Sequence, residues 1–207
     1  MVEKKVVDGW DDPRMPTLSG LRRRGFTPKS IRTFISKVGI AKRENIIDVS
    51  LLEFCVREDL NKEANRKMVV LDPLKLTIRN YPNDKVEKLF SEDNPEKENT
   101  PSREIPFAKS LYIEREDFKE EAGRKFFRLT IGKEVRLKSA YIIKAVDIVK
   151  DDKGIVQEVI CDYDPKSKSG SNNEESLRKV KGTLHWVTQS HSICLLYTSP
   201  SPRDTRE

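Results

Sequence analysis

The chain has 207 residues, of which 36% are charged and 36% hydrophobic, and its formal net charge is +6. This composition is polar for a globular protein but excludes global disorder, and the length allows one large domain or two small ones. The mild excess of cations permits a polyanionic partner without requiring one.

Residues 9–25 are dense in proline, glycine, aspartate and arginine, and they run directly into a helical pattern. Pro13 and Pro16 have fixed φ angles and lack an N–H, so the segment predicts a stiff entry to a helix rather than a strand. The four arginines of this segment keep their charge at any working pH.

The first half of the chain is predicted to be helical. Thr27 suits an N-cap and Pro28 the first helical position, while Gly39 is placed to end the helix. A second helix is expected to begin near Asp48 or Ser50, because leucines and a cysteine then recur at helical spacing.

At residue 68 the pattern changes from helical to strand-like. Two apolar runs are split by Pro73, and in the second Leu74, Leu76 and Ile78 alternate with polar residues, as in a half-buried strand. The polar residues 82–100 are predicted to form an extended, mobile surface connection.

Further strands are expected along the second half of the chain, at residues 105–113, 126–131, 134–137, 141–150, 156–162 and 180–187. A short helix is expected at 115–122, a hairpin turn at 151–154 and a flexible loop at 165–177. Many short strands with little helix favour an antiparallel β-barrel. The predicted fold class is therefore α+β, with a helical subdomain followed by an antiparallel barrel.

No catalytic or metal site is predicted. The cysteines Cys55, Cys161 and Cys194 are far apart and form no C-x-x-C pair, so neither a disulfide framework nor a zinc site is indicated. His185 lies in a strand pattern and is interpreted as structural. Phosphate-binding and nucleophile motifs are absent, and the adjacent acidic pairs suit solvated turns better than acid–base chemistry.

Membrane association is not indicated either. No apolar run approaches the roughly 20 residues of a membrane span, and residues 1–5 do not resemble a secretory signal. We therefore expect a cytoplasmic protein without a membrane partner.

Nucleic-acid binding has better support, because basic side chains occur on one strand face and where loops meet strands. They are Lys75, Arg79, Arg103, Arg178, Lys179 and Lys181. A barrel edge with basic loops suits single-stranded RNA, whose unstacked bases and phosphates accept hydrogen bonds from Arg and Lys. For each residue alone, a solvated surface charge is the alternative interpretation.

Long ordered runs carry a family resemblance over residues 6–192. They are residues 9–25, 46–61, 70–76, 103–107, 132–137 and 181–187. These runs resemble glutaminyl-tRNA synthetases, members of the glutaminyl/glutamyl branch of the class I aminoacyl-tRNA synthetases. The glutamyl enzymes share the Trp-Asp-Asp-Pro-Arg element at 10–14, whereas residues 22–24 and 55–60 look glutaminyl.

The resemblance implies an enzyme of protein biosynthesis that activates glutamine with ATP and Mg²⁺ and esterifies it to its tRNA. It implies a parent enzyme that is cytoplasmic and monomeric. Both ATP signature motifs of the family are absent from these residues, so no catalytic residue is carried over. We expect this polypeptide to bind no ATP or Mg²⁺ and to be inactive alone.

The resemblance also implies roles for the basic residues. The strand after the Asp-Pro element would contact the inner face of the tRNA through Lys75, Thr77, Arg79 and Asn80. Arg103 would hydrogen-bond an anticodon base. Arg178 and Lys179 correspond to an anticodon-contacting loop, and Lys181 is assigned to tRNA binding with them.

We predict three parts: the end of the catalytic domain with the helical subdomain at 1–67, a truncated anticodon-binding barrel at 68–193, and a non-native tail at 194–207. The amino-acid sequence of the tail resembles a translated sequencing-library adapter. Two alternatives stay open, a stand-alone RNA-binding barrel without enzymatic activity and a glutamate–tRNA ligase. The amino-acid specificity cannot be determined from these residues, because the amino-acid pocket is not among them.

Overall fold

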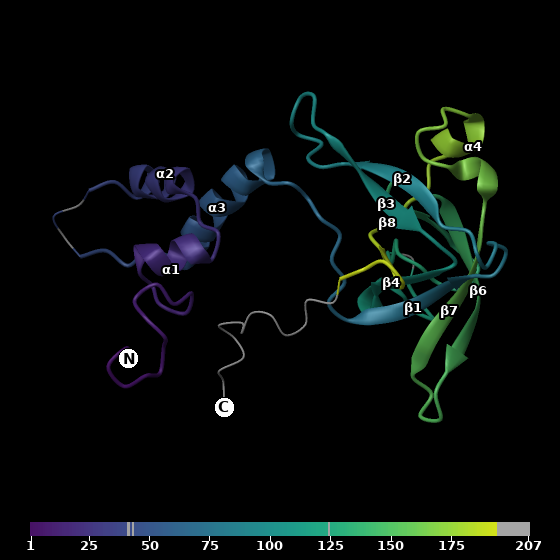
Figure 1. Cartoon of the computed structure of the whole chain (residues 1–207), viewed down its shortest axis with the longest axis horizontal. Helices are drawn as coiled ribbons and strands as arrows, with labels where there is room; N and C mark the ends of the chain where they lie inside the picture. Colours follow the sequence, from purple (N-terminus) through teal and green to yellow (C-terminus); the bar gives the residue numbers. More distant parts are fainter. Residues whose placement is uncertain (41, 43, 124, 194–207) are drawn as a thin grey trace. The chain divides into compact units, whose positions relative to one another are not determined.

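The computed structural model describes residues 1–40, 42, 44–123 and 125–193, which form two compact units (Figure 1). The helical unit comprises Met1–Asn65 together with Asn94–Thr100. The sheet unit comprises Arg66–Asp93 together with residues 101–193. The predicted tail at 194–207 lies outside the described residues.

Three helices make up most of the helical unit: α1 (Leu18–Arg23), α2 (Pro28–Val38) and α3 (Val49–Glu63). Each has the capping side chain that its sequence supplies. Thr27 accepts a hydrogen bond from the Ser30 N–H at 3.0 Å, and Asp48 accepts one from the Ser50 N–H at 2.8 Å. Gly39 ends α2 with a φ of 73°, which confirms its predicted role.

The segment before α1 is held together by the buried carboxylate of Asp12. It accepts hydrogen bonds from the Arg14 guanidinium at 2.7 and 2.9 Å and from the Arg14 and Asp8 backbone N–H groups. These donors, above all the Arg14 side chain, hold the pKa of Asp12 well below its ordinary value. Gly20 packs so closely on this turn that a Cβ would lie 2.4 Å from the Met15 carbonyl oxygen.

The last turn of α3 is completed by Asn94, whose side chain is buried. Its amide donates to the carbonyl oxygens of Asn61, Lys62 and Ala64, each at 3.1 Å, and its own oxygen accepts from the Glu96 N–H at 3.0 Å. The carbonyls that end a helix have no intrahelical partner. The two hydrogens of one amide from the 94–100 segment are therefore shared among three acceptors at this helix end.

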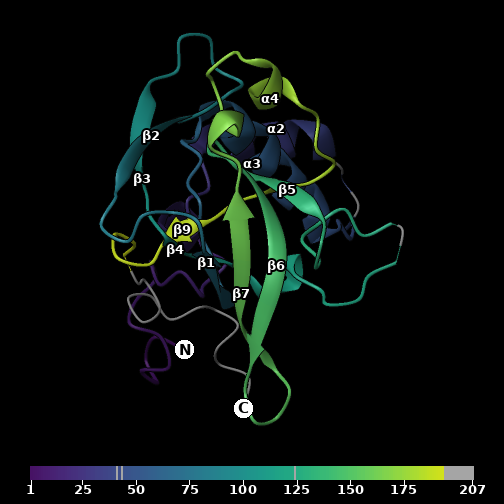
Figure 2. The ribbon, with the colours of Figure 1, turned by 90° about the vertical axis from the view of Figure 1, so that its right-hand side faces the viewer.

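The sheet unit contains a seven-stranded sheet in the order β8-β5-β6-β7-β1-β4-β9 and a separate two-stranded sheet, β2-β3. The strands are β1 (Pro73–Ile78), β2 (Glu87–Glu92), β3 (Ser102–Phe107), β4 (Ser110–Glu114), β5 (Glu134–Leu137), β6 (Ile142–Lys150), β7 (Val156–Tyr163), β8 (Thr183–Leu184) and β9 (Val187–Thr188). Figure 2 shows β6 and β7 side by side as a long hairpin. Its Asp151–Gly154 turn, with Gly154 at a φ of 80°, confirms the predicted turn.

The α+β class is confirmed, and the predicted antiparallel barrel is a curled, half-barrel sheet whose pairing is not all antiparallel. The large sheet is mixed, because β1 pairs with β7 in parallel and β5 pairs with β8 in parallel. Its two edge strands, β8 and β9, are consecutive in the chain and are separated by His185 and Trp186. The sheet therefore curls so that two residues connect its edge strands, and among the described residues no strand pairing joins β8 to β9.

An aromatic cluster fills the inside of this curled sheet. Trp186, Phe107 and Tyr81 are almost fully buried, and Phe107 meets the rings of both Trp186 and Tyr81 edge-on at 5.2 Å. Tyr141 and Tyr163 extend the cluster. The apolar side chains of β1 at 74, 76 and 78 face the same core, as the alternation predicted.

Several local predictions need correction. The 82–100 segment is not simply an extended connection, since it contains β2, whose Leu89 is buried in the core. The single strand predicted at 105–113 is two strands, β3 and β4, and the helix predicted at 115–122 is the short η1 (Arg115–Asp117). Among the described residues, 126–131 form isolated bridges rather than a strand. The 165–177 loop contains η2 (Pro165–Ser167) and α4 (Glu174–Leu177).

Candidate nucleic-acid interface

The outward face of β1 carries the predicted row of polar side chains. Lys75 forms an ion pair with Glu158 of β7 at 3.2 Å. Arg79 binds Asp162 through two hydrogen bonds of 2.6 and 3.0 Å, an arrangement that fixes the plane of the guanidinium. The two cations are therefore oriented by β7 carboxylates, and a phosphate would have to compete with those carboxylates.

Thr77 and Asn80 lie on the same strand and its continuation. The Thr77 hydroxyl is buried and lacks a hydrogen-bond partner among the described residues. The Asn80 amide exchanges two hydrogen bonds of 2.9 Å with the backbone of Tyr163, which continues the pairing of β1 with β7 beyond the strand end. Asn80 thus has a structural role, and its contact with tRNA stays a prediction.

Arg178 is surrounded by carboxylates. Its guanidinium lies 3.0 Å from Glu134, 3.4 Å from Asp164 and 3.4 Å from Glu175. All four side chains are partly exposed, so each pair contributes little stability by itself. Together the three acids hold Arg178 against the sheet.

Lys179 and Lys181 follow on the same loop. Lys179 is exposed, and no ion pair or hydrogen bond engages its side chain within the described ranges. The Lys181 ammonium lies over the Phe127 ring, 5.5 Å from its centroid. Lys179 is therefore the cation of this loop most available to a ligand.

The structure brings Arg79, Asn80 and the loop to the same end of β7. Asp162 accepts a hydrogen bond from Arg79, the backbone of Tyr163 is hydrogen-bonded to the Asn80 amide, and Asp164 accepts a hydrogen bond from Arg178. These three acceptors are consecutive residues. The end of β7 thus links two groups that the sequence places about a hundred positions apart.

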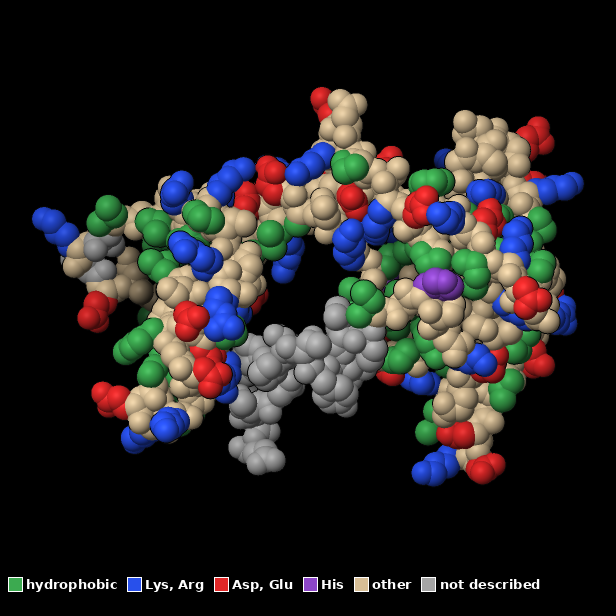
Figure 3. Space-filling model, in the orientation of Figure 1, with side chains coloured by type: hydrophobic (Ala, Val, Ile, Leu, Met, Phe, Trp, Pro, Cys, Tyr) green, Lys and Arg blue, Asp and Glu red, His purple; other side chains and the backbone are tan. Residues whose placement is uncertain are grey.

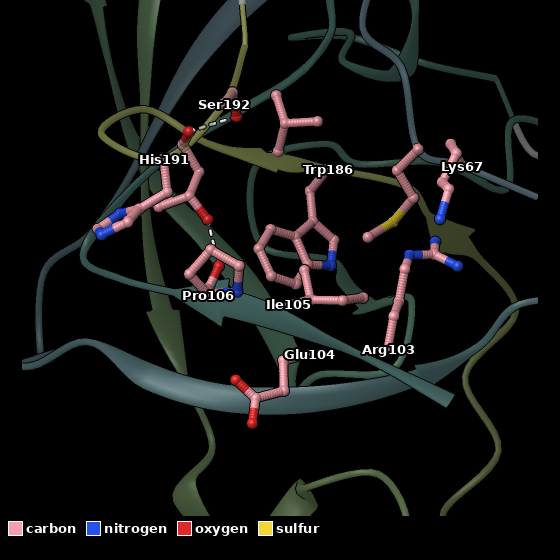
Figure 4. A pocket seen from close by; sticks show the side chains of 11 residues that line it. Lys67, Arg103, Glu104, Ile105, Pro106, Trp186, His191 and Ser192 are labelled. Atoms are coloured by element: carbon pink, nitrogen blue, oxygen red, sulfur yellow. Dashed lines mark hydrogen bonds between the residues drawn. The ribbon is translucent and has the colours of Figure 1, made fainter. Parts of the chain in front are cut away.

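Arg103 lies in a separate pocket of the sheet unit, with a volume of about 160 Å³. The pocket is lined by Lys67, Met68, Arg103, Glu104, Ile105, Pro106, Trp186, Val187, Thr188, His191 and Ser192. Figure 4 shows the Arg103 and Lys67 head groups on one side of the Trp186 indole and His191 on the other, with Glu104 directed away. The pocket combines cations at one side with an apolar floor.

The cations of this pocket are held by Asp93. Arg103 donates to the Asp93 carboxylate at 2.7 Å, and Lys67 lies 3.3 Å from the same oxygen. The hydrogen bond from Arg103, assisted by Lys67, keeps the pKa of Asp93 below its ordinary value. The Asp93 carboxylate therefore stays ionised near neutral pH, and its ion pair orients Arg103 beside the indole.

The sequence did not indicate most of this pocket. Lys67, Met68 and Trp186 are far from Arg103 in the chain, and Asp93 lay in a segment predicted to be mobile. No spacing rule connects them, because β-sheet pairing and core packing bring them together. Trp186 is the one pocket residue whose type hints at a binding site in the sequence, but the pattern at 180–187 predicts only a strand there.

Charge alone does not mark an interface on this surface. Lys, Arg, Asp and Glu side chains are interspersed on the face drawn in Figure 3. Within the described ranges, no group of three or more His, Cys, Asp and Glu side chains could hold a metal ion. None of the helices in the same part of the chain is both long and apolar enough to cross a bilayer.

Comparison with known families gives two matches that lie end to end. Residues 1–62 match the catalytic domain of the class I tRNA synthetases (E and Q). Residues 64–164 match the anticodon-binding domain of the same class. The boundary between the two matches falls at the end of α3, next to the start of the sheet unit.

Individual relatives agree with these matches. The chain is 58% identical to a glutamine–tRNA ligase of Rhodopirellula baltica over 192 residues, which are 93% of this chain and 32% of the relative. It is 50% identical to that of Vibrio cholerae over 98% of this chain and 37% of the relative, and 51% identical to that of Clostridium kluyveri over 93% and 34%. The chain spans about a third of the length of these curated relatives.

Proposed function

Because this chain belongs to the glutaminyl branch of the class I tRNA synthetases, we propose that it is the tRNA-binding part of a glutamine–tRNA ligase. In this proposal, residues 1–67 are the end of the catalytic domain and the helical subdomain, and 68–193 bind the anticodon region. The partner is the tRNA that accepts glutamine. The parent enzyme works as a monomer in the cytoplasm and uses ATP and Mg²⁺ at residues outside this chain.

The observation that carries the proposal is the oriented Arg103 beside Trp186. Arg103 is held by Asp93 at the mouth of a pocket whose floor is apolar. An unpaired nucleobase offers hydrogen-bond acceptors at its edge and an apolar face, so it suits such a pocket. A single-stranded anticodon loop presents bases in this unpaired state.

The β1 cations and Lys179 suit a different part of the RNA. Lys75 and Arg79 lie on the outward face of the sheet, and Lys179 is exposed on the loop. Contacts of this kind to phosphate position an RNA without reading its sequence. We propose that Lys75, Thr77, Arg79 and Asn80 follow the inner face of the tRNA, and that Arg178, Lys179 and Lys181 lie along the anticodon loop.

Replacing Arg103 with alanine is expected to weaken binding of the cognate anticodon stem-loop by roughly 1–3 kcal/mol, the scale of a specific base contact. Fluorescence anisotropy with a labelled stem-loop measures this at fixed salt. The matched control is Lys88→Ala, which removes a paired cation, bound to Glu104, from the neighbouring strand β2. We expect little change in that variant.

A second RNA with a scrambled anticodon distinguishes base from phosphate recognition. If Arg103→Ala weakens binding to both RNAs equally, Arg103 contacts phosphate and its assignment to a base is wrong. If wild-type protein binds neither RNA, the RNA-binding proposal itself fails.

The polypeptide of these 207 residues is expected not to charge tRNA. It carries neither ATP signature motif of the family, so glutamine cannot be activated. Incubation with tRNA, labelled glutamine and ATP, followed by acid precipitation, measures the charging. Label in the precipitate above the no-enzyme background would contradict this prediction.

The two alternatives differ in what they predict for the gene. A stand-alone RNA-binding protein has no use for residues 1–62, which match a catalytic domain. A glutamate–tRNA ligase has a different amino-acid pocket, although the relatives reported above are all glutamine–tRNA ligases. The upstream reading frame, with or without both ATP motifs, distinguishes an enzyme from a separate module.

A further inference from the structure

The guanidinium of Arg136 in β5 binds the loop that carries Arg178 and Lys179. Its Nη1 atom donates to the Ser167 carbonyl at 3.0 Å and to the Ser169 hydroxyl at 3.3 Å. Its Nη2 atom donates to the carbonyls of Ser176 at 2.8 Å and Arg178 at 3.3 Å. One side chain thus joins both ends of the segment from η2 to the residue before Lys179.

Arg136 lacks the usual partner of a buried cation. Within the described ranges, no carboxylate forms an ion pair with it, whereas Arg178 has three. Burial, together with the positive charge of Arg178, lowers the pKa of Arg136. A partly buried guanidinium is costly unless its donors are satisfied, so this position requires the loop carbonyls as acceptors.

The loop in turn depends on such anchors. The helix α4 has four residues, too few to be stable without tertiary contacts. Ser167 receives a hydrogen bond from the Ile142 N–H at 2.8 Å, and Lys168 binds Glu87 at 2.5 Å, so the first half of the loop is fixed independently. In the second half, the ion pairs hold the Arg178 side chain, while Arg136 binds the backbone itself next to Lys179, at the Ser176 and Arg178 carbonyls.

We propose that Arg136 is a positioning residue for RNA recognition, which holds the backbone of Ser176 and Arg178 so that Lys179 faces the RNA, without touching the RNA itself. This inference rests on the proposed tRNA binding. It predicts that a side chain that makes no contact with RNA controls the affinity through the loop conformation.

The test compares Arg136→Met with Arg115→Met in the full 207-residue chain. Arg115 is the control, because its guanidinium also donates to backbone carbonyls, those of Val156 at 2.7 Å and Pro73 at 3.3 Å. It pairs in addition with Asp72 at 3.3 Å, and none of these three partners belongs to the loop. We expect Arg136→Met to weaken anticodon stem-loop binding about fivefold or more, and Arg115→Met to leave it nearly unchanged. Circular dichroism at the assay temperature confirms that both variants are folded.

A double-mutant cycle with Lys179→Ala separates positioning from direct contact. If Arg136 acts through Lys179, Arg136→Met has little further effect on affinity in the Lys179→Ala background. If the double variant loses affinity by the product of the two single-variant fold-changes, Arg136 acts independently of Lys179 and the proposal is wrong.

Limited trypsin digestion gives a readout without RNA. Arg136→Met is expected to speed cleavage after Arg178 and Lys179 several-fold relative to wild type, whereas Arg115→Met does not. If the two variants bind RNA and are cleaved alike, the positioning role is refuted. Failure of wild type to bind the stem-loop would instead refute the tRNA-binding proposal, and the digestion would still report whether Arg136 fixes the loop.

If Arg136→Met does not fold, Arg136→Lys replaces it in every measurement. One ammonium cannot reach both pairs of acceptors that the guanidinium fork spans, so loop cleavage should rise and affinity should fall. Wild-type behaviour of Arg136→Lys in both assays would overturn the proposal.

Discussion

Replacing Trp186 with alanine is expected to destabilise the sheet unit by about 3–5 kcal/mol, the range for removing a large aromatic side chain from a core. Trp186 is fully buried, its ring meets Phe107 edge-on at 5.2 Å, and its Nε1 atom donates to the Lys138 carbonyl at 3.0 Å. It also lies between the two edge strands of the sheet. The substitution therefore opens a cavity where the curled sheet meets itself.

The free energy of unfolding of the sheet unit can be measured by urea denaturation, monitored through the β-sheet signal in circular dichroism. Trp10→Ala is the matched control, because this second tryptophan is 70% exposed and its loss should change stability by no more than about 0.5 kcal/mol. Trp186→Phe keeps most of the buried ring and should be milder than Trp186→Ala. Equal stability of the Trp186→Ala and Trp10→Ala variants would show that the core does not depend on this indole.

Asn94→Asp is expected to destabilise the helical unit by roughly 2–4 kcal/mol at neutral pH. The change keeps the shape of the side chain but removes the amide that donates to three carbonyls at the end of α3. These acceptors are partly buried, so each of the two lost donor hydrogens costs no more than the roughly 1–3 kcal/mol of a fully buried unpaired acceptor. The new negative charge also lies at the negative end of the helix dipole. The repulsion and the lost donors act in the same direction.

The pH dependence distinguishes the charge from the lost donors. Burial beside carbonyl oxygens raises the pKa of the introduced carboxyl above its unfolded value of about 3.9. Its destabilising effect therefore grows as the pH rises above about 4 and shrinks at lower pH, where the protonated form can donate one hydrogen bond.

Thermal unfolding of wild type, Asn94→Asp and Asn94→Ala at pH 3 and pH 7 tests this prediction. Asn94→Ala loses the donors without adding charge, so its loss of stability should vary little with pH. If Asn94→Asp and Asn94→Ala behave alike at both pH values, the electrostatic part of the argument is wrong.

Local chemistry in the sequence was sufficient for the ends of α2. Thr27, Pro28 and Gly39 define the ends of α2 because capping and backbone freedom depend on a few neighbouring residues. The alternation at 74–78 defined both the strand and its buried face for the same reason. The ordered motifs of the chain also identified the family, which the comparisons confirmed.

The sequence by itself therefore determined α2 and α3, the strands with strong alternation, the α+β class and the family. Only the tertiary structure decided the parallel pairing of β1 with β7, the open curled sheet and the pocket of Arg103. It also decided that Asp93 holds Arg103 and that Arg136 binds the loop before Lys179. These features join residues far apart in the chain, and hydrogen-bond pairing and close packing across such separations leave no periodic signal in the sequence.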